Sequence, residues 1–246
     1  MDLGIRGRTA AVAAASTGLG FGSAAALVAE GVKVAICSRD RERVEAAAKR
    51  LGQGVVAIVA DVSTEAGAAS FVDQAVSALG PIDILVPNAG GPPRGFPSET
   101  TLQAYRDALD LNTLSTIVMC QRALKAMRER RWGRIVAITS AGARSPIPTL
   151  AASSTARAAV TSFLKVLATE VAKDGVTVNS VQPGAHATDR IKGNGPLEEI
   201  AKRIPAGIVG TADDFGKVVA FLSSEPAKFI TGTSVLIDGG AFSGLI

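Results

Sequence analysis

The chain has 246 residues, of which 47% are hydrophobic and 4% aromatic, so we expect a core built mainly from Ala, Val, Leu and Ile. The formal net charge is +4, and the basic residues are scattered except at Arg128–Arg134, a pattern more typical of a solvated helix end than of a nucleic-acid surface. Two cysteines without paired spacing indicate neither a metal site nor disulfides, which favours the cytoplasm. The start of the chain lacks a signal-peptide pattern and no apolar run reaches about 18 residues, so no membrane association is expected.

Short apolar segments rich in β-branched residues recur along the chain. We predict strands at Thr9–Ala14, Val32–Ser38, Val55–Ala60, Ile82–Val86, Arg134–Ser140, Val176–Val181 and Ser234–Ile237. Amphipathic segments between them predict crossover helices at Gly20–Glu30, Arg41–Leu51, Glu65–Leu79, Leu102–Arg130 and Ala151–Lys173. Strands that are apolar on both faces and separated by helices are typical of parallel sheets. The predicted fold class is therefore α/β, with residues 1–246 forming one Rossmann-like doubly wound domain around a seven-stranded parallel sheet flanked by helices.

A loop-like tract rich in glycine, polar and charged residues follows the sixth predicted strand, at Gly184–Gly195. Open α/β sheets bind ligands at the carboxyl ends of their strands, so the tract predicts a substrate lid at residues 185–205. The alternative is a simple surface excursion.

The segment "VAAASTGLG", Val12–Gly20, links the first predicted strand to the first predicted helix. Gly18 and Gly20 allow close approach of a ligand, and the free N–H groups at a helix start suit a pyrophosphate. A tight strand-to-helix turn without a ligand would look similar, so this pattern alone does not decide between the two.

The second predicted strand ends in "ICSRD", which bears on the choice of nucleotide. In dinucleotide sites an acidic residue near this strand end binds the ribose 2′-hydroxyl, whereas a basic residue accommodates a 2′-phosphate. Here Ser38 stands where the acid is expected and Arg39 follows it, so the sequence favours NADP over NAD. Asp40 leaves open that Arg39 only pairs locally or caps a helix.

Several short motifs follow one another in an order that resembles the short-chain dehydrogenase/reductase family, closest to its broad 3-oxoacyl-(acyl-carrier-protein) reductase group. They are the glycine loop at 13–20, "DV" at 61–62, "NAG" at 88–90, "ITS" at 138–140, "QPG" at 182–184 and "ITGTSVLIDGG" near the end. The resemblance covers essentially the whole chain. With the glycine loop and the second strand, it implies a cofactor site made of Ser16, Thr17, Gly18, Leu19, Gly20, Ser38, Arg39, Asp61, Val62, Asn88, Ala89, Gly90, Arg157, Pro183, Gly184 and Thr188.

The same resemblance implies a catalytic set of Asn, Ser, Tyr and Lys, and the matching positions here hold Asn112, Ser140, Ser153 and Arg157. Their successive spacings of 28, 13 and 4 residues are those that the family pattern expects. The tyrosine and lysine positions thus carry a serine and an arginine. The chain's one tyrosine, Tyr105, lies in an amphipathic stretch where packing is the favoured role.

Two further departures from the family pattern concern the glycine loop and the lid. Ala13 and Ala14 replace the usual Thr and Gly, which is expected to restrict the turn to negative φ. His186 follows the "PG" pair where the family usually has an aliphatic residue. Its imidazole could exchange protons near neutral pH, although a packing or surface role is the commoner one for a lone histidine.

The sequence as a whole predicts an NADP-dependent oxidoreductase that reduces a carbonyl or oxidises an alcohol. Ser140 and Arg157 would act electrostatically, and the proton would come from water, Ser153 or His186. One alternative is a catalytically weak or inactive NADP-binding sensor or oligomeric partner, and another is non-redox lyase-type chemistry in the same pocket. By similarity a homotetramer or dimer is expected, acting on a small molecule. No metal or nucleic-acid partner is expected.

Overall fold

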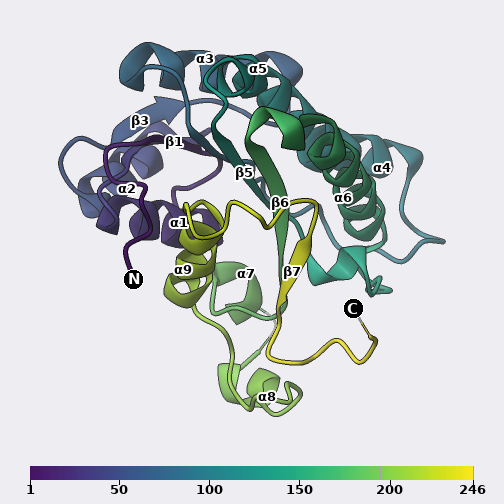
Figure 1. Ribbon diagram of the computed structural model, residues 1–246. Coiled ribbons are helices and arrows are strands. Elements are labelled where there is room, and N and C mark those ends of the chain that lie inside the picture. The colour runs from purple at the N-terminus through teal and green to yellow at the C-terminus, as the bar shows by residue number, and fades with distance from the viewer. Residues whose placement is uncertain (194, 246) are drawn as a thin grey trace.

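Seven parallel strands form one sheet in the order β3-β2-β1-β4-β5-β6-β7 (Figure 1). The computed structural model describes residues 1–193 and 195–245. The predicted α/β class and the seven-stranded parallel sheet are confirmed, and each predicted strand lies within two residues of the observed one at either end. The strands are β1 Thr9–Val12, β2 Lys33–Ser38, β3 Val56–Val59, β4 Ile84–Val86, β5 Gly133–Ile138, β6 Val176–Pro183 and β7 Ser234–Ile237.

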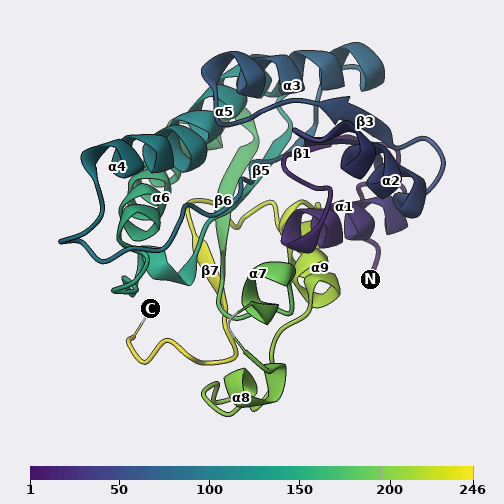
Figure 2. The same cartoon turned by 180° about the vertical axis from the view of Figure 1, so that it is seen from behind.

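Helices cover both faces of the sheet because its central strands are apolar on both sides. Along β1, for example, Ala11 belongs to one core cluster and Ala10 and Val12 to the other. Helices α3, α5 and α6 pack on the first face, and α1, α2 and α9 pack on the second (Figures 1 and 2). The helices are α1 Gly18–Ala29, α2 Arg41–Leu51, α3 Glu65–Leu79, α4 Leu102–Leu109, α5 Ser115–Glu129, α6 Ala151–Val171, α7 Asp189–Lys192, α8 Leu197–Ala201 and α9 Ala212–Leu222.

The helix predicted at Leu102–Arg130 is not regular throughout. The predicted segment is helical along its length, and a π-helical turn at Asp110–Leu114 separates α4 from α5 within it. Hydrophobic periodicity reports which side of a helix is buried, and it does not report the insertion of one extra residue into a turn. This turn carries Asn112, so the irregularity falls on a predicted site residue.

The topology creates a crevice at the carboxyl ends of the strands. Strand β1 lies between β2 and β4, so the chain leaves β1 toward one edge and later continues from β4 toward the other. The loops that follow these two strands diverge, which opens a space between them. The tract predicted as a lid follows β6 and contains α7 and α8, which lie beyond the ends of the strands (Figure 2). Asn194, within that tract, lies outside the described residues.

Candidate active site

A cleft of about 890 Å³ occupies this crevice. All residues predicted to hold the cofactor line it, namely Ser16, Thr17, Gly18, Leu19, Gly20, Ser38, Arg39, Asp61, Val62, Asn88, Ala89, Gly90, Arg157, Pro183, Gly184 and Thr188. Three of the four predicted catalytic residues, Ser140, Ser153 and Arg157, line the same cleft, whereas Asn112 does not. The fold therefore gathers into one cleft residues that are far apart in the sequence.

Close backbone contacts shape the loop between β1 and α1. Gly18 has a φ of +61°, and a Cβ on Gly20 would lie 2.7 Å from the Ala14 carbonyl oxygen and 2.8 Å from the Asn88 amide nitrogen. That amide donates hydrogen bonds of 3.2 Å to the carbonyl oxygens of both Ala13 and Ala14. The loop opens the twelve-residue helix α1, whose first N–H groups have no intrahelical acceptors. A helix start at which glycines leave the backbone N–H groups accessible fits a pyrophosphate.

The backbone at Ala14 differs from the sequence-based expectation. Its φ is +47°, in the left-handed region, so the prediction that alanine here would restrict the turn to negative φ was wrong. Contacts from β2 and from the segment after β4 hold this conformation: Asn88 donates to the Ala14 carbonyl oxygen, and the Ala14 N–H donates to the Cys37 sulfur at 3.4 Å. Tertiary contacts therefore outweigh a local cost of about 1–2 kcal/mol.

Replacing Ala14 with glycine is expected to raise the free energy of unfolding by about 0.5–1 kcal/mol, because glycine adopts positive φ without the steric cost. The gain is smaller than the strain since glycine also adds entropy to the unfolded chain. Urea denaturation measures it. The matched control is Ala13→Gly, at a buried neighbour without positive φ, which should lower stability. Equal effects of the two substitutions would contradict the assignment of strain to Ala14.

Arg39 lines the cleft at the end of β2, while its neighbour Asp40 is engaged elsewhere. The Asp40 carboxylate caps α2 by accepting a 3.0 Å hydrogen bond from the Arg43 N–H, and it lies 3.5 Å from the Arg43 Nε. At the same end of the cleft, burial acts to raise the pKa of Asp61, but hydrogen bonds from Ser63 and the charge of Arg39 outweigh it and lower that pKa. Asp40 therefore caps α2, and the positive charge of Arg39 acts on Asp61 in the cleft.

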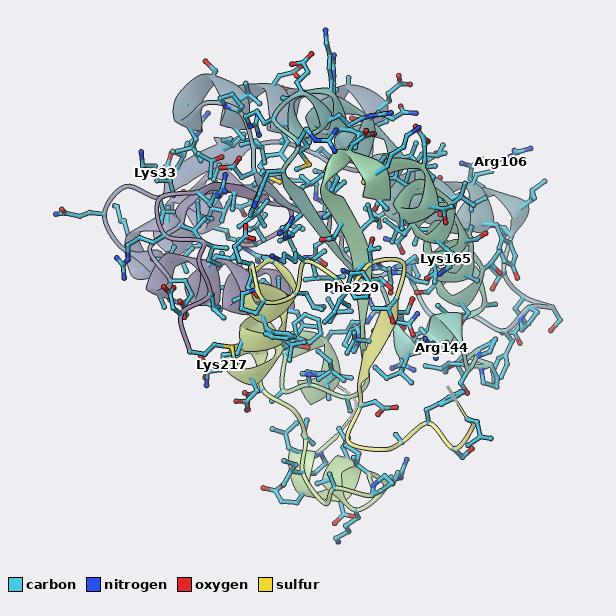
Figure 3. All side chains as sticks on the ribbon, viewed as in Figure 1. Lys33, Arg106, Arg144, Lys165, Lys217 and Phe229 are labelled. Carbon is cyan, nitrogen blue, oxygen red and sulfur yellow. The ribbon has the colours of Figure 1, made fainter. Side chains whose placement is uncertain are left out.

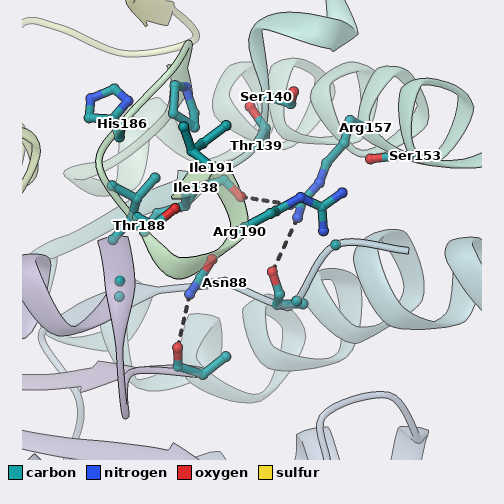
Figure 4. A pocket seen from close by; sticks show the side chains of 18 of the residues that line it. Asn88, Ile138, Thr139, Ser140, Ser153, Arg157, His186, Thr188, Arg190 and Ile191 are labelled. Atoms are coloured by element: carbon teal, nitrogen blue, oxygen red, sulfur yellow. Dashed lines mark hydrogen bonds between the residues drawn. The ribbon is translucent and has the colours of Figure 1, made fainter. Parts of the chain in front are cut away.

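Two serines face the cleft at its other end (Figure 4). Ser140 follows β5, and its Oγ accepts a 3.0 Å hydrogen bond from the Gly142 N–H. Because that bond uses a lone pair of the oxygen, the hydroxyl hydrogen can point into the cleft. Ser153 lies in the first turn of α6 and is mostly buried, and its hydroxyl has no hydrogen-bond partner among the described residues. Both hydroxyls are available to a ligand.

Arg157 lies one turn after Ser153 and places its charge beside these hydroxyls. Its Nη1 donates a 2.8 Å hydrogen bond to the carbonyl oxygen of Ile138, and its Nη2 donates one of 3.2 Å to that of Ala89 (Figure 4). Burial, with a smaller contribution from Arg190, lowers the pKa of Arg157 to about 10. The guanidinium therefore stays charged at neutral pH. Its two hydrogen bonds hold it in place, and its positive charge can stabilise a negative charge in the cleft.

Asn112 and Tyr105 lie outside the cleft lining. The Asn112 amide nitrogen donates a 3.0 Å hydrogen bond to the carbonyl oxygen of Gly90, and its Oδ1 is buried with no partner among the described residues. Its position behind the cleft wall supports the Gly90 segment. Tyr105 packs against a small cluster that contains Ala108 and Ala152, which agrees with the packing role favoured from the sequence.

His186 is buried against the interior side of the lid. Its Nδ1 lies 3.3 Å from the Gly184 carbonyl oxygen, and its ring meets that of Phe215 edge to face with centroids 5.2 Å apart. A Cβ on Gly210 would lie 2.7 Å from the ring, so Gly210 makes room for it. In Figure 4 the imidazole lies apart from Ser153 and Arg157. The geometry favours the packing role of His186 over a proton-donor role.

Burial lowers the pKa of His186, although its contact with Gly184 and the charge of Asp214 oppose the shift. The unfolded chain therefore takes up a proton at higher pH than the folded chain does, starting near the ordinary histidine pKa of about 6.5. Stability present above that pH is expected to be lost progressively as the pH falls below it. Since the chain has one histidine, urea denaturation between pH 7.5 and about 5.5 isolates this effect. His186→Gln should flatten the profile, and an unchanged slope would contradict the assignment.

Three arginines of the cleft had not been singled out from the sequence, and one of them, Arg43, comes from α2. Arg190 comes from α7 in the lid, and Arg94 comes from the loop after β4. The sequence held one signal that could have identified Arg190: it lies two residues after Thr188, in a tract expected to cover the cleft. No periodicity or motif, however, shows which way a loop side chain points.

Within residues 1–193 and 195–245, no cluster of His, Cys, Asp and Glu could hold a metal ion. No helix in that part of the chain is long and apolar enough to cross a membrane.

Comparisons with known proteins agree with this fold. A family model described as enoyl-(acyl carrier protein) reductase matches residues 13–241. The 3-oxoacyl-(acyl-carrier-protein) reductase of Haemophilus influenzae is 32% identical over 240 residues, which cover 97% of this chain and 99% of the relative. An inactive 2-(S)-hydroxypropyl-CoM dehydrogenase 2 of Xanthobacter autotrophicus is 36% identical over 225 residues, covering 88% of this chain and 98% of the relative.

Among solved structures, the L-sorbose reductase of Gluconobacter frateurii in complex with NADPH and L-sorbose superposes with a TM-score of 0.94 at 28% identity, and the match covers 100% of both chains. The family model, the relatives and this structure each span nearly the whole sheet and its helices. The chain therefore belongs to the short-chain dehydrogenase/reductase family of oxidoreductases, and it is similar to the 3-oxoacyl-(acyl-carrier-protein) reductases of that family.

Proposed function

We propose that the protein is an NADP-dependent oxidoreductase that reduces a carbonyl group or oxidises the corresponding alcohol. The observation that carries this proposal is the arrangement of the cleft, which joins a pyrophosphate-sized backbone cradle and Arg39 to Ser140, Ser153 and Arg157. A basic residue at the end of β2 suits a 2′-phosphate. The similar L-sorbose reductase is a complex with NADPH, which supports the same choice of nucleotide here.

The cofactor, when bound, supplies the hydride. The chain's own residues act on the carbonyl oxygen. The Ser140 hydroxyl donates a hydrogen bond to it, and the Arg157 charge stabilises the negative charge that develops there. Neither Arg157 nor a serine hydroxyl gives up a proton readily at neutral pH, so the proton comes from water in the space beside Ser153. The missing phenol is expected to lower the rate by about 10²- to 10⁴-fold relative to a site with a positioned acid.

A second candidate is an NADP-binding protein with little or no hydride transfer, acting as a sensor or as a partner within an oligomer. The similar Xanthobacter protein described as inactive supports keeping this alternative. The serine and arginine at positions 153 and 157 support it too, because they leave the cleft without a good general acid.

Single-turnover hydride transfer from bound NADPH tests the proposal. The protein is mixed with one equivalent of NADPH and a panel of ketones, aldehydes and imines, and the loss of the reduced nicotinamide absorbance is followed. Slow but substrate-dependent oxidation is expected. Micromolar NADPH affinity with no oxidation by any compound would favour the sensor, and no affinity for either nicotinamide dinucleotide would exclude both candidates.

We propose further that a second copy of the chain covers the face that carries β7 and the exposed side of α6. Phe229 is 98% exposed and Val166 68% exposed, and Phe229 lies on this face near Lys165 (Figure 3). Exposed large apolar side chains next to an edge strand are typical of association sites. Sedimentation equilibrium should find a dimer or tetramer that Phe229→Asp weakens. An unchanged assembly, or a monomeric parent protein, would contradict this.

A further inference from the structure

Two arginines that have no carboxylate partner in the part of the chain that the structure describes converge at the end of the cleft away from Arg39. Arg157 enters from α6 and Arg190 from α7 in the lid, and Figure 4 shows their side chains approaching one another. Among the described residues, neither forms an ion pair with an aspartate or glutamate. Arg94 adds a third positive charge, since it is near enough to affect Arg190.

Arg190 reaches across the cleft from the lid to the loop after β4. Its guanidinium occupies the space beside Gly91, where a Cβ would lie only 1.6 Å from its Nη1. Its Nη2 donates to the carbonyl oxygen of Pro92 at 3.4 Å, which is a long and weak hydrogen bond. Most of its donors thus have no acceptor within residues 1–193 and 195–245, and the position of the group depends on Gly91 having no side chain.

The convergence of like charges is unfavourable unless an anion joins them. Burial lowers the pKa of both arginines, and the charge of Arg190 lowers that of Arg157 further. Of the carboxylates in the cleft lining, Asp238 accepts hydrogen bonds from the N–H groups of Gly240 and Phe242. Asp61 belongs to the Arg39 end, and Asp189 precedes Arg190 on α7 and also lines the cleft. An anion between the guanidinium groups would remove their repulsion and use the remaining donors of Arg190.

This pair lies apart from the places expected for the phosphates of the cofactor. Thr188 faces the phosphate loop, since its Cγ2 would lie 3.5 Å from a Cβ on Gly18. Arg190, two residues later, faces Gly91 instead. Arg39, the residue suited to a 2′-phosphate, stands at the other end. The two arginines therefore border the space next to Ser153, where the reacting carbonyl belongs.

We propose that the substrate is a small oxo acid whose carboxylate is bound by Arg190, with Arg157 placing a second positive charge between that carboxylate and the reacting carbonyl. A guanidinium matches the planar carboxylate with two parallel hydrogen bonds. The inference rests on the proposed function, because it assigns the class of substrate to that same site.

The experiment compares acids with their neutral esters. Acetoacetate and levulinate are titrated by calorimetry into protein saturated with NADP⁺, alongside methyl acetoacetate and methyl levulinate, so that no turnover occurs and two chain lengths are covered. At least one acid should bind tenfold or more tightly than its ester. Arg190→Gln should remove that preference while leaving ester binding unchanged, and Arg190→Lys should restore part of it. The control, Arg203→Gln, removes an exposed lid arginine outside the cleft lining and should change nothing.

Equal binding of acid and ester, or an acid preference that survives Arg190→Gln, would overturn the proposal. The same titrations on protein without cofactor separate two failures. If neither nicotinamide dinucleotide binds, the proposed function fails, while an Arg190-dependent acid preference still supports the anion site. If the acids bind only to the cofactor-free protein and NADP⁺ displaces them, the arginines serve the cofactor phosphates and the assignment to the substrate is wrong.

Discussion

Replacing Arg39 with glutamate is expected to weaken NADPH binding about 100-fold while changing NADH binding by a few-fold at most. The two cofactors differ only in the 2′-phosphate, so a residue that binds this phosphate affects one and not the other. A charge-assisted hydrogen bond is worth about 1.5–3 kcal/mol, and the new carboxylate adds repulsion against the phosphate. Fluorescence titration with both reduced cofactors measures the two affinities on the same protein.

Arg41→Glu is the matched control. It reverses a charge two residues away, but Arg41 is exposed, lies 3.4 Å from Glu45 and is not a residue of the cleft lining. A general change in surface potential would weaken binding in both variants, whereas a specific phosphate contact is lost only in Arg39→Glu. Equal losses of NADPH and NADH affinity in Arg39→Glu would remove Arg39 from the 2′-phosphate site.

The fold and much of the cleft could be predicted because both follow from local patterns with a simple geometric consequence. Buried parallel strands must be apolar on both faces, and their crossovers must be helices, so the order of elements defines the sheet. Residues that directly follow the strands then meet at one edge. The family resemblance assigned Ser38, Asp61, Asn88 and Ser140 to one site, which agrees with this geometry, and all four line the cleft.

The features that sequence patterns missed depend on contacts between distant segments. The positive φ of Ala14 is held by Asn88 and Cys37, which local preference cannot foresee. The π-helical turn that carries Asn112 inserts an extra residue into the helical segment between α4 and α5, which hydrophobic periodicity does not report. Arg190 lines the cleft, and its guanidinium occupies the space beside Gly91, a residue far away in the sequence. In each case the deciding interaction joins segments far apart in the chain or changes a turn that periodicity does not resolve.

The double replacement Ser153→Tyr with Arg157→Lys is expected to raise the single-turnover rate of ketone reduction by about 10²- to 10⁴-fold. A phenol with a pKa near 10 can be tuned toward neutrality by a nearby cation, whereas an alkyl hydroxyl starts far higher. Ser153 lines the cleft one helical turn before Arg157, so a tyrosine there would extend a phenol toward the space that holds water in the proposed mechanism.

The two single variants show how much of the rate gain comes from the tyrosine and how much from the lysine. Ser153→Tyr alone should give a smaller gain, because Arg157 remains tied to the carbonyl oxygens of Ile138 and Ala89 and its charge is held there. Arg157→Lys alone should give none, since it supplies no acid. The double variant should also lose rate at high pH as the phenol ionises, a limb that the parent protein lacks. If the double variant binds NADPH normally and gains nothing, the cleft does not hold the carbonyl beside Ser153, and the roles proposed for Ser140 and Arg157 at the carbonyl oxygen are wrong as well.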